Sequence, residues 1–156
     1  MYFLGDILHW RNFKMQYNNT VKDRYFIYLG DNKYQSYSIN SYTVTTTTQS
    51  QYYQNDNQRS HLKHFVIPGG SFGFPCDSIV DVDTWFMDFY MDTLLQSSSI
   101  KKVGKLDEET LLKLYKLIKN STRVAYQMKI DIYECYYKEG LKVEKPRRKK
   151  RGKYRN

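Results

Sequence analysis

The stretch IKKVGKLDEETLLKLYKLI, residues 100–118, marks the point at which the pattern of apolar residues changes. From Leu106 onward, apolar residues recur at steps of three and four, which indicates one apolar face of a helix. Asp107 is suited to cap this helix, and Glu108 and Glu109 fall in its first turn, where the helix dipole favours acids. The C-terminal part of the chain is therefore predicted to be helical.

The length of this helix depends on the residues near Asn120. Apolar residues keep the helical spacing as far as Tyr136, and Gly140 offers a stop. An unbroken helix would extend to about residue 138 and measure about 45 Å, which exceeds what a small barrel covers. Its second half would then pack against a partner chain or a second copy. The alternative is two helices separated by a break at Asn120 and Ser121, and the pattern favours neither.

In the first 90 residues the pattern predicts short strands joined by polar segments. GDILHW at 5–10 and RYFIYL at 24–29 are two such strands, and the second is continuous enough to be covered on both faces. The polar residues 11–23 form a predicted loop between them. Further strands are predicted for the threonine-rich YTVTTTT at 42–48 and for 76–89, where a strand passes into a short helical turn.

The basic residues are concentrated at the C-terminus. The net charge is +9, and the last twelve residues, KPRRKKRGKYRN, hold eight lysines or arginines and no acid, which leaves +1 for residues 1–144. A block of like charges repels itself and is predicted to be disordered. Such a tail either adds phosphate contacts that weaken with salt or acts as a solubilising, nonspecific contact for polyanions.

Several classes of protein are disfavoured by what the sequence lacks. It contains no glycine-rich phosphate-binding motif, no zinc-binding motif and no nucleophile-elbow motif. The two cysteines lack metal-ligand spacing and are predicted to be free, buried thiols. No apolar run approaches the length of a membrane span, and the N-terminus lacks a signal-peptide pattern, so a cytoplasmic protein without a membrane association is expected.

The order of these segments resembles that of the MazF/PemK family of toxin endoribonucleases, which have a CcdB/Kid-type fold. Five segments follow one another over residues 5–120 as their counterparts do in that family. They are GDILHW, KDRYFIYLG, VTTTTQ, CDSIVDVDTWF and the stretch at 100–118 quoted above. The resemblance implies a mainly β fold with C-terminal α structure, namely a small SH3-like antiparallel β-barrel with a long terminal helix. We expect the barrel domain at 1–120, a helical extension at 121–144 and a basic disordered tail at 145–156.

The same resemblance implies a homodimer that cleaves single-stranded RNA without a metal or other cofactor. By position, Arg24 matches the family's catalytic arginine, Thr47 its catalytic threonine, and Asp83 a catalytic aspartate of some PemK-like members. Two positions depart from the pattern: Tyr25 stands where the family usually has proline, and Asp81 stands where those members have arginine.

The residues themselves suit this chemistry. RNA supplies its own nucleophile, the 2′-hydroxyl, so a protein needs groups that bind phosphate and move protons. The fork of Arg24 can hold two phosphate oxygens, and the hydroxyl of Thr47 can orient the attacking group or donate to the phosphate. Asp83, His61 or His64 is the candidate base. The alternative is structural: a surface ion pair for Arg24 and a sheet hydroxyl for Thr47.

Single-stranded RNA is usually bound by aromatic stacking between basic residues. Two polar loops that we expect to flank the site carry both residue types, although ordinary surface loops can have the same composition. The predicted RNA-binding residues are Lys14, Tyr17, Lys22, Gln49, Tyr52, Tyr53 and Arg59.

The leading hypothesis is therefore a sequence-selective endoribonuclease, the toxin of a toxin–antitoxin pair. Its partners would be single-stranded RNA, a cognate antitoxin protein and a second copy of the chain. Two alternatives remain: a catalytically inactive nucleic-acid-binding module of the same fold, and a gyrase-inhibiting relative. The second alternative calls for an aromatic C-terminus, whereas this chain ends in basic residues.

Overall fold

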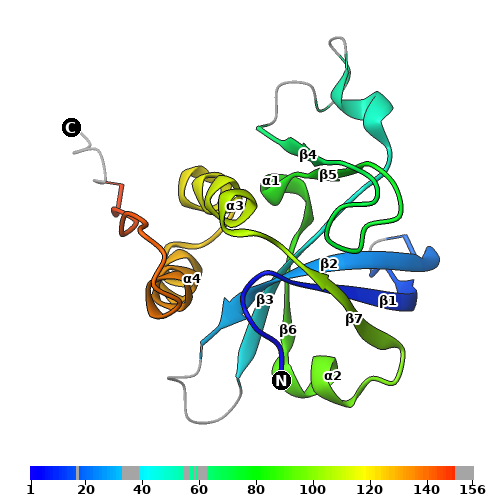
Figure 1. Cartoon of the computed structure of the whole chain (residues 1–156), viewed down its shortest axis with the longest axis horizontal. Helices are drawn as coiled ribbons and strands as arrows, with labels where there is room; N and C mark the ends of the chain where they lie inside the picture. Colours follow the sequence, from blue (N-terminus) through cyan, green and yellow to red (C-terminus); the bar gives the residue numbers. More distant parts are fainter. Residues whose placement is uncertain (17, 33–38, 55–56, 58, 60–62, 150–156) are drawn as a thin grey trace, which may run out of the picture.

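The computed structural model describes residues 1–16, 18–32, 39–54, 57, 59 and 63–149. Figure 1 shows a twisted sheet with α3 and α4 on one side, and with α1 and the β4–β5 pair beyond the end of β3. The strands are β1 (Asp6–Lys14), β2 (Val21–Asp31), β3 (Asn40–Thr45), β4 (Phe65–Ile67), β5 (Ser78–Val80), β6 (Phe86–Tyr90) and β7 (Ile100–Lys105). The helices are η1 (Ser50–Tyr53), α1 (Val82–Trp85), α2 (Met91–Gln96), α3 (Glu108–Asn120) and α4 (Tyr126–Lys138).

The main sheet is open, and the predicted closed barrel is wrong. Its five strands lie in the order β6-β3-β2-β1-β7, and every neighbouring pair is antiparallel. Within the described residues, β6 and β7 are the two edges of this sheet and do not pair with each other, while β4 and β5 form a separate two-stranded sheet. The fold is thus mainly β with helices, as predicted, but without closure.

The two sheets meet at the end of the threonine run. The N–H of Thr46 still donates to the carbonyl of Tyr25 in β2, at 3.2 Å. One residue later, Thr47 exchanges two backbone hydrogen bonds with Ile79 in β5, at 3.2 and 2.8 Å. The chain therefore changes its strand partner between Thr46 and Thr47, and this bridge links the main sheet to the β4–β5 pair.

Several predicted boundaries in the β region need correction. The loop predicted at 11–23 is shorter, because β1 continues to Lys14 and β2 begins at Val21. A register shift between Trp10 and Phe13 interrupts β1, and Asn12 there adopts a φ of 52°. Such a bulge bends the strand and re-aims its side chains.

The segment predicted as a strand with a helical turn at 76–89 contains three elements. The strand β5 leads into the four-residue helix α1, as predicted. The helix α1 is followed directly by the edge strand β6. Asp81 caps α1 by accepting from the N–H of Thr84 at 3.1 Å. The opposite edge strand, β7, was also not predicted. It lies under the turn at 69–75, where a Cβ on Gly104 would come within 1.8 Å of the Phe72 carbonyl oxygen.

The C-terminal helical region is two helices, so the unbroken helix is the wrong alternative. Asp107 caps α3 as predicted by accepting from the N–H of Thr110 at 2.9 Å. The break occurs at Ser121, which has an extended backbone. Its hydroxyl accepts from the N–H groups of Arg123 and Val124, both at 3.1 Å, and this local bonding replaces helical continuation.

The second helix, α4, packs on the body of its own chain, whereas the second half of an unbroken helix was expected to pack against a partner chain or a second copy. Ile132 and Tyr136 of α4 are fully buried, and the Tyr136 hydroxyl donates to the Leu111 carbonyl of α3 at 3.0 Å. The helix lies against β2 at Gly30, where a Cβ would come within 2.5 Å of the Cys135 sulfur. α4 ends as predicted before Gly140, whose φ is +78°.

Two further predictions concern the thiols and membrane spans. Cys76 and Cys135 are both free, as predicted, but Cys76 is exposed and Cys135 half-buried, so the expected burial is wrong for Cys76. Within the described part of the chain, no helix combines the length and apolarity that a membrane crossing requires.

Candidate active site

Arg24 and Thr47 line the same small cavity. It measures about 110 Å³ and lies where the start of β2 faces the residues that connect β3 to η1. Its walls include Lys22, Arg24 and Tyr25 of β2, the threonines 46–48, and Cys76 and Ser78. We call this cavity the arginine–threonine pocket. Two residues that are distant in sequence are thus brought together by the register of the sheet and by the partner change at Thr47.

Arg24 is buried, with 6% of its surface exposed. β2 places it opposite Trp10, and its guanidinium carbon lies 5.3 Å from the ring centroid of Trp85 in α1. The same indole is contacted by Arg59, at 5.1 Å. A cation over an indole is stabilised by the ring quadrupole, which orients the guanidinium without neutralising its charge.

Two cations, Lys22 and Arg24, line this pocket together with one acid, Asp23. Burial, and then the charge of Arg24, lower the pKa of Lys22. Lys22 lines the pocket together with Arg24. An anion bound between two cations at one small opening would reduce the repulsion between their charges.

The hydroxyl of Thr47 differs from those of Thr43 and Thr45 in the hydrogen bond that it makes. The hydroxyls of Thr43 and Thr45 donate to backbone carbonyls within the sheet, each at 2.9 Å. The Thr47 oxygen instead accepts from the N–H of Gln49 at 3.2 Å, which fixes the oxygen while its own proton is directed elsewhere. Thr47 is 6% exposed, whereas Gln49 itself is exposed.

Asp81 and Asp83, at the start of α1, do not line the arginine–threonine pocket. Asp83 accepts a hydrogen bond from the hydroxyl of Ser121, at the end of α3. Asp81 is fully buried and accepts from the Tyr53 hydroxyl at 2.8 Å and from Thr84. The structure therefore brings Arg24 and Thr47 together, whereas Asp83 is bonded to Ser121 and does not line the pocket.

The predicted RNA-binding residues separate into groups. Lys22 lines the arginine–threonine pocket, and Lys14 lines a different cavity with Trp10 and Phe89. Tyr52, Tyr53 and Arg59 form one cluster, with the Arg59 guanidinium 5.2 and 5.9 Å from the two tyrosine rings.

Within that cluster, the buried Tyr53 donates to Asp81, and its ring lies tilted against His64, with ring centroids 4.7 Å apart. Tyr52 is half-buried and remains the more accessible ring. Tyr17 and His61 lie outside the described residues.

Sequence reasoning missed a histidine–aspartate pair beside the pocket. His9 Nε2 lies 3.2 Å from Asp23 Oδ2, and the His9 ring stacks on Tyr25 with centroids 4.7 Å apart. Asp23 and Tyr25 both line the pocket. The available signal was the pairing of His9 with Tyr25 across β1 and β2, which requires the strand register and cannot be read from the residues alone.

The β1 bulge holds this pair in place. The N–H of Asn12, at the bulge, donates to Asp23 Oδ1 at 3.0 Å. This hydrogen bond, followed by the hydrogen bond and the charge of His9, lowers the pKa of Asp23. Asp23 thus stays ionised and can orient the His9 ring.

Comparisons of the chain with protein-family models, with curated proteins and with solved structures gave no match. Function is therefore argued from the geometry of the site.

Proposed function

We propose that this protein is a metal-independent, sequence-selective endoribonuclease of the MazF/PemK type, which cleaves single-stranded RNA. The observation that carries the proposal is the presence of Arg24 and Thr47, together with Lys22, in one pocket of about 110 Å³. We take the open sheet, with its bridge from Thr47 to Ile79, as the counterpart of that family's bent SH3-like barrel. A homodimer, an inhibiting antitoxin protein and a cytoplasmic location belong to the same proposal.

In this mechanism the scissile phosphate sits against Arg24, whose fork binds two non-bridging oxygens. The 2′-oxygen attacks phosphorus as the P–O5′ bond breaks, which gives a 2′,3′-cyclic phosphate and a 5′-hydroxyl. Negative charge that develops on the phosphoryl oxygens is stabilised by Arg24 and Lys22, and the Thr47 hydroxyl donates to one of those oxygens. A preorganised donor of this kind typically contributes about 10²–10³-fold to the rate.

The proton of the 2′-hydroxyl needs an acceptor, and we assign this role to His9. Its imidazole takes up the proton, and the ionised Asp23 at 3.2 Å stabilises the resulting imidazolium. The departing 5′-oxygen takes a proton from water, and the imidazolium then returns its proton to the hydroxide that remains, so His9 is neutral again. Asp83, engaged with Ser121, has no part in this mechanism.

A second candidate is a nucleic-acid-binding module of the same fold without catalysis. It is favoured by the placement of Asp83 outside the pocket and by Tyr25 at the position of the family's usual proline. Such a module would bind RNA through the same cations and leave the strand intact.

The test uses the full chain with a long single-stranded RNA in EDTA. We expect discrete cuts that leave cyclic phosphate ends, identified by mass spectrometry. Arg24→Ala is expected to lower the cleavage rate by about 10²-fold or more, and Thr47→Val by about tenfold. Thr48→Val is the matched control, because Thr48 lines the pocket but is exposed, and it should retain the rate.

The outcomes separate the two candidates. RNA that is bound but never cut by the wild type would establish the binding module. Cutting that survives Arg24→Ala and Thr47→Val unchanged would remove this pocket from the reaction.

A further inference from the structure

A second, larger cavity lies between the turn that joins α3 to α4 and the C-terminal segment. It measures about 800 Å³, and none of its lining residues is acidic. Four of them are cationic: Lys129, Arg147, Arg148 and Lys149. The remaining walls are uncharged residues of the turn and Tyr126 at the start of α4. We call it the basic cavity.

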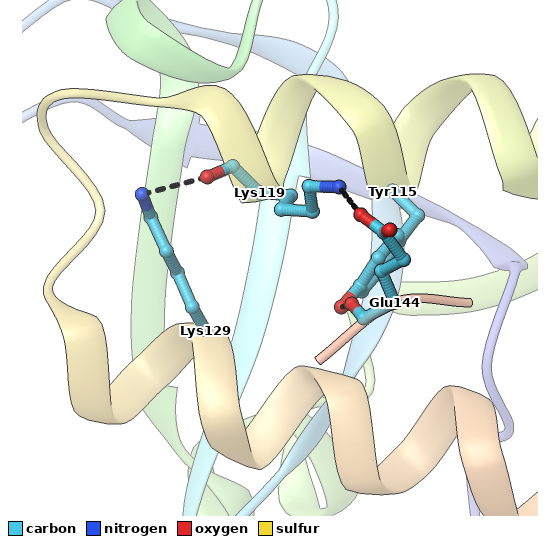
Figure 2. Close-up of polar contacts among 4 residues, drawn as sticks. All are labelled: Tyr115, Lys119, Lys129 and Glu144. Atoms are coloured by element: carbon cyan, nitrogen blue, oxygen red, sulfur yellow. Dashed lines mark hydrogen bonds and ion pairs between the residues drawn. The ribbon is translucent and has the colours of Figure 1, made fainter. Parts of the chain in front are cut away.

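The C-terminal segment that supplies three of these cations is attached to the body of the protein. The Tyr115 hydroxyl donates to the Glu144 carbonyl, and Lys119 Nζ contacts Glu144 Oε2, both at 2.5 Å (Figure 2). Pro146 is buried. Residues 145–149, predicted to begin a disordered tail, are therefore held beside α3 and α4; residues 150–156 lie outside the described part.

The side chains in the basic cavity are also oriented. Lys129 Nζ donates to the carbonyls of Lys119 and Ser121 at 3.0 and 2.6 Å, and the first of these bonds is visible in Figure 2. An ammonium has three N–H donors, so one remains for a ligand. The Arg148 guanidinium carbon lies 5.3 Å from the ring centroid of Tyr126, which limits its rotation.

The positive charge in the basic cavity is not balanced by acids. Among the described residues, none of the four cations forms an ion pair, and Glu144, which also feels the charge of Arg147, is already paired with Lys119. Burial and then the charge of Lys149 lower the pKa of Lys129, and the charge of Asp83 opposes this shift only in part. The cations thus repel one another in the absence of an anion.

The start of α4 adds to this field. Ala125 at its N-cap provides no side-chain hydrogen bond, and its first turn holds no acid. The N–H groups at the start of a helix carry partial positive charge and favour anions. Here that end borders a cavity that already gathers four cations.

We propose that the basic cavity binds phosphate groups, supplied either by the backbone of single-stranded RNA or by a small oligophosphate. Its volume exceeds what one phosphate needs, and its cations come from two elements, so it suits two or more phosphates. The ring of Tyr126 is already covered by Arg148, so recognition is of phosphate rather than of bases. No residue of this cavity lines the arginine–threonine pocket, and the inference is independent of catalysis there.

The test measures binding of the full chain to a fluorescent single-stranded RNA over a series of salt concentrations. The double variant Lys129→Gln/Arg148→Gln removes two cavity cations. Lys142→Gln/Lys145→Gln is the matched control, because it removes two exposed charges of the same segment that do not line the cavity. Each single-stranded phosphate contact contributes about 0.7 to the slope of log affinity against log salt, so we expect a slope lower by about 1.4 for the first variant only.

Tripolyphosphate as a competitor identifies the source of the phosphate. If tripolyphosphate displaces RNA from the wild type, and does so less effectively from the cavity variant, the basic cavity also binds small oligophosphates. If tripolyphosphate does not displace the RNA, the cavity is assigned to the polynucleotide. Equal losses in the two double variants, or no loss in either, would overturn the proposal. Arg147→Gln/Lys149→Gln, which alters only exposed residues, replaces the first variant if circular dichroism shows that the first does not fold.

Failure of this site and failure of the proposed enzyme remain distinguishable. Arg24→Ala should abolish cleavage and leave the difference between the cavity variant and its control intact. If the wild type never cuts RNA but that difference persists, the endoribonuclease proposal fails and the phosphate site stands.

Discussion

The two cationic regions of this molecule differ in how they hold an arginine. In the arginine–threonine pocket, Arg24 is 6% exposed, faces a cavity of about 110 Å³ and lies on the buried Trp85. In the basic cavity of about 800 Å³, Arg148 is exposed and lies on the half-buried Tyr126. The first region holds one buried guanidinium in a defined geometry, while the second gathers several cations on a more exposed surface. Equal sign of charge therefore does not imply equal sensitivity to mutation.

The largest expected difference concerns the two supporting rings. Trp85→Ala removes a buried side chain that contacts Arg24 and Arg59, and it should lower the free energy of unfolding by about 3–5 kcal/mol. Tyr126→Ala removes a half-buried ring and should cost clearly less. Urea denaturation of both variants measures this difference, and equal losses would contradict the contrast between the two regions.

The next difference concerns the geometry of the cation. Arg24→Lys keeps the charge but loses the planar fork, so the proposed cleavage rate should fall by about 10²-fold while the salt dependence of RNA affinity stays the same. Arg148→Lys should leave RNA affinity within about twofold, because an exposed point charge suffices there. Single-turnover cleavage and fluorescence anisotropy measure the two effects. A similar response of both sites would show that Arg24 acts only through its charge.

The smallest expected effect is the dependence of the C-terminal segment on pH. The hydrogen bond and charge of Lys119, followed by the charge of Arg147, lower the pKa of Glu144 in the folded protein. The stabilisation is therefore complete above the ordinary glutamate pKa of about 4.3 and is lost as the pH falls through the lowered value. The protection of the amides of residues 141–149 against hydrogen exchange, relative to their intrinsic exchange rate at each pH, should fall over that range. Glu144→Gln should show low protection at every pH.

Local signals in the sequence predicted local structure well. The cap at Asp107 and the stop at Gly140 depend only on neighbouring residues, and both are present. The break at Ser121 was left open because the helical spacing continues through it; the hydroxyl that competes with the helix gives no periodic signal. The edge strand β7 was missed for a related reason, since its covering turn comes from a distant segment.

The candidate site shows the same division. Arg24 and Thr47 were selected by resemblance, and they do line one pocket. His9 and Asp23 were missed because their contact depends on the register between β1 and β2 and on the bulge at Asn12. Asp83 was selected by position, and its partner Ser121 lies at the break between α3 and α4, which the sequence left undecided.

The partner change at Thr47 makes the number of threonines in TTTT matter, although they are chemically identical. Successive side chains of an extended chain point to opposite sides, so loss of one threonine from 45–48 would rotate everything after it by half a turn. Thr45, whose hydroxyl donates to the Tyr25 carbonyl, and Thr47, whose hydroxyl accepts from the Gln49 N–H, are two positions apart. Their side chains therefore point to the same side of the chain. A single-codon deletion in this run would thus barely change the composition, yet it would shift Gln49 and every later residue by one position relative to β3.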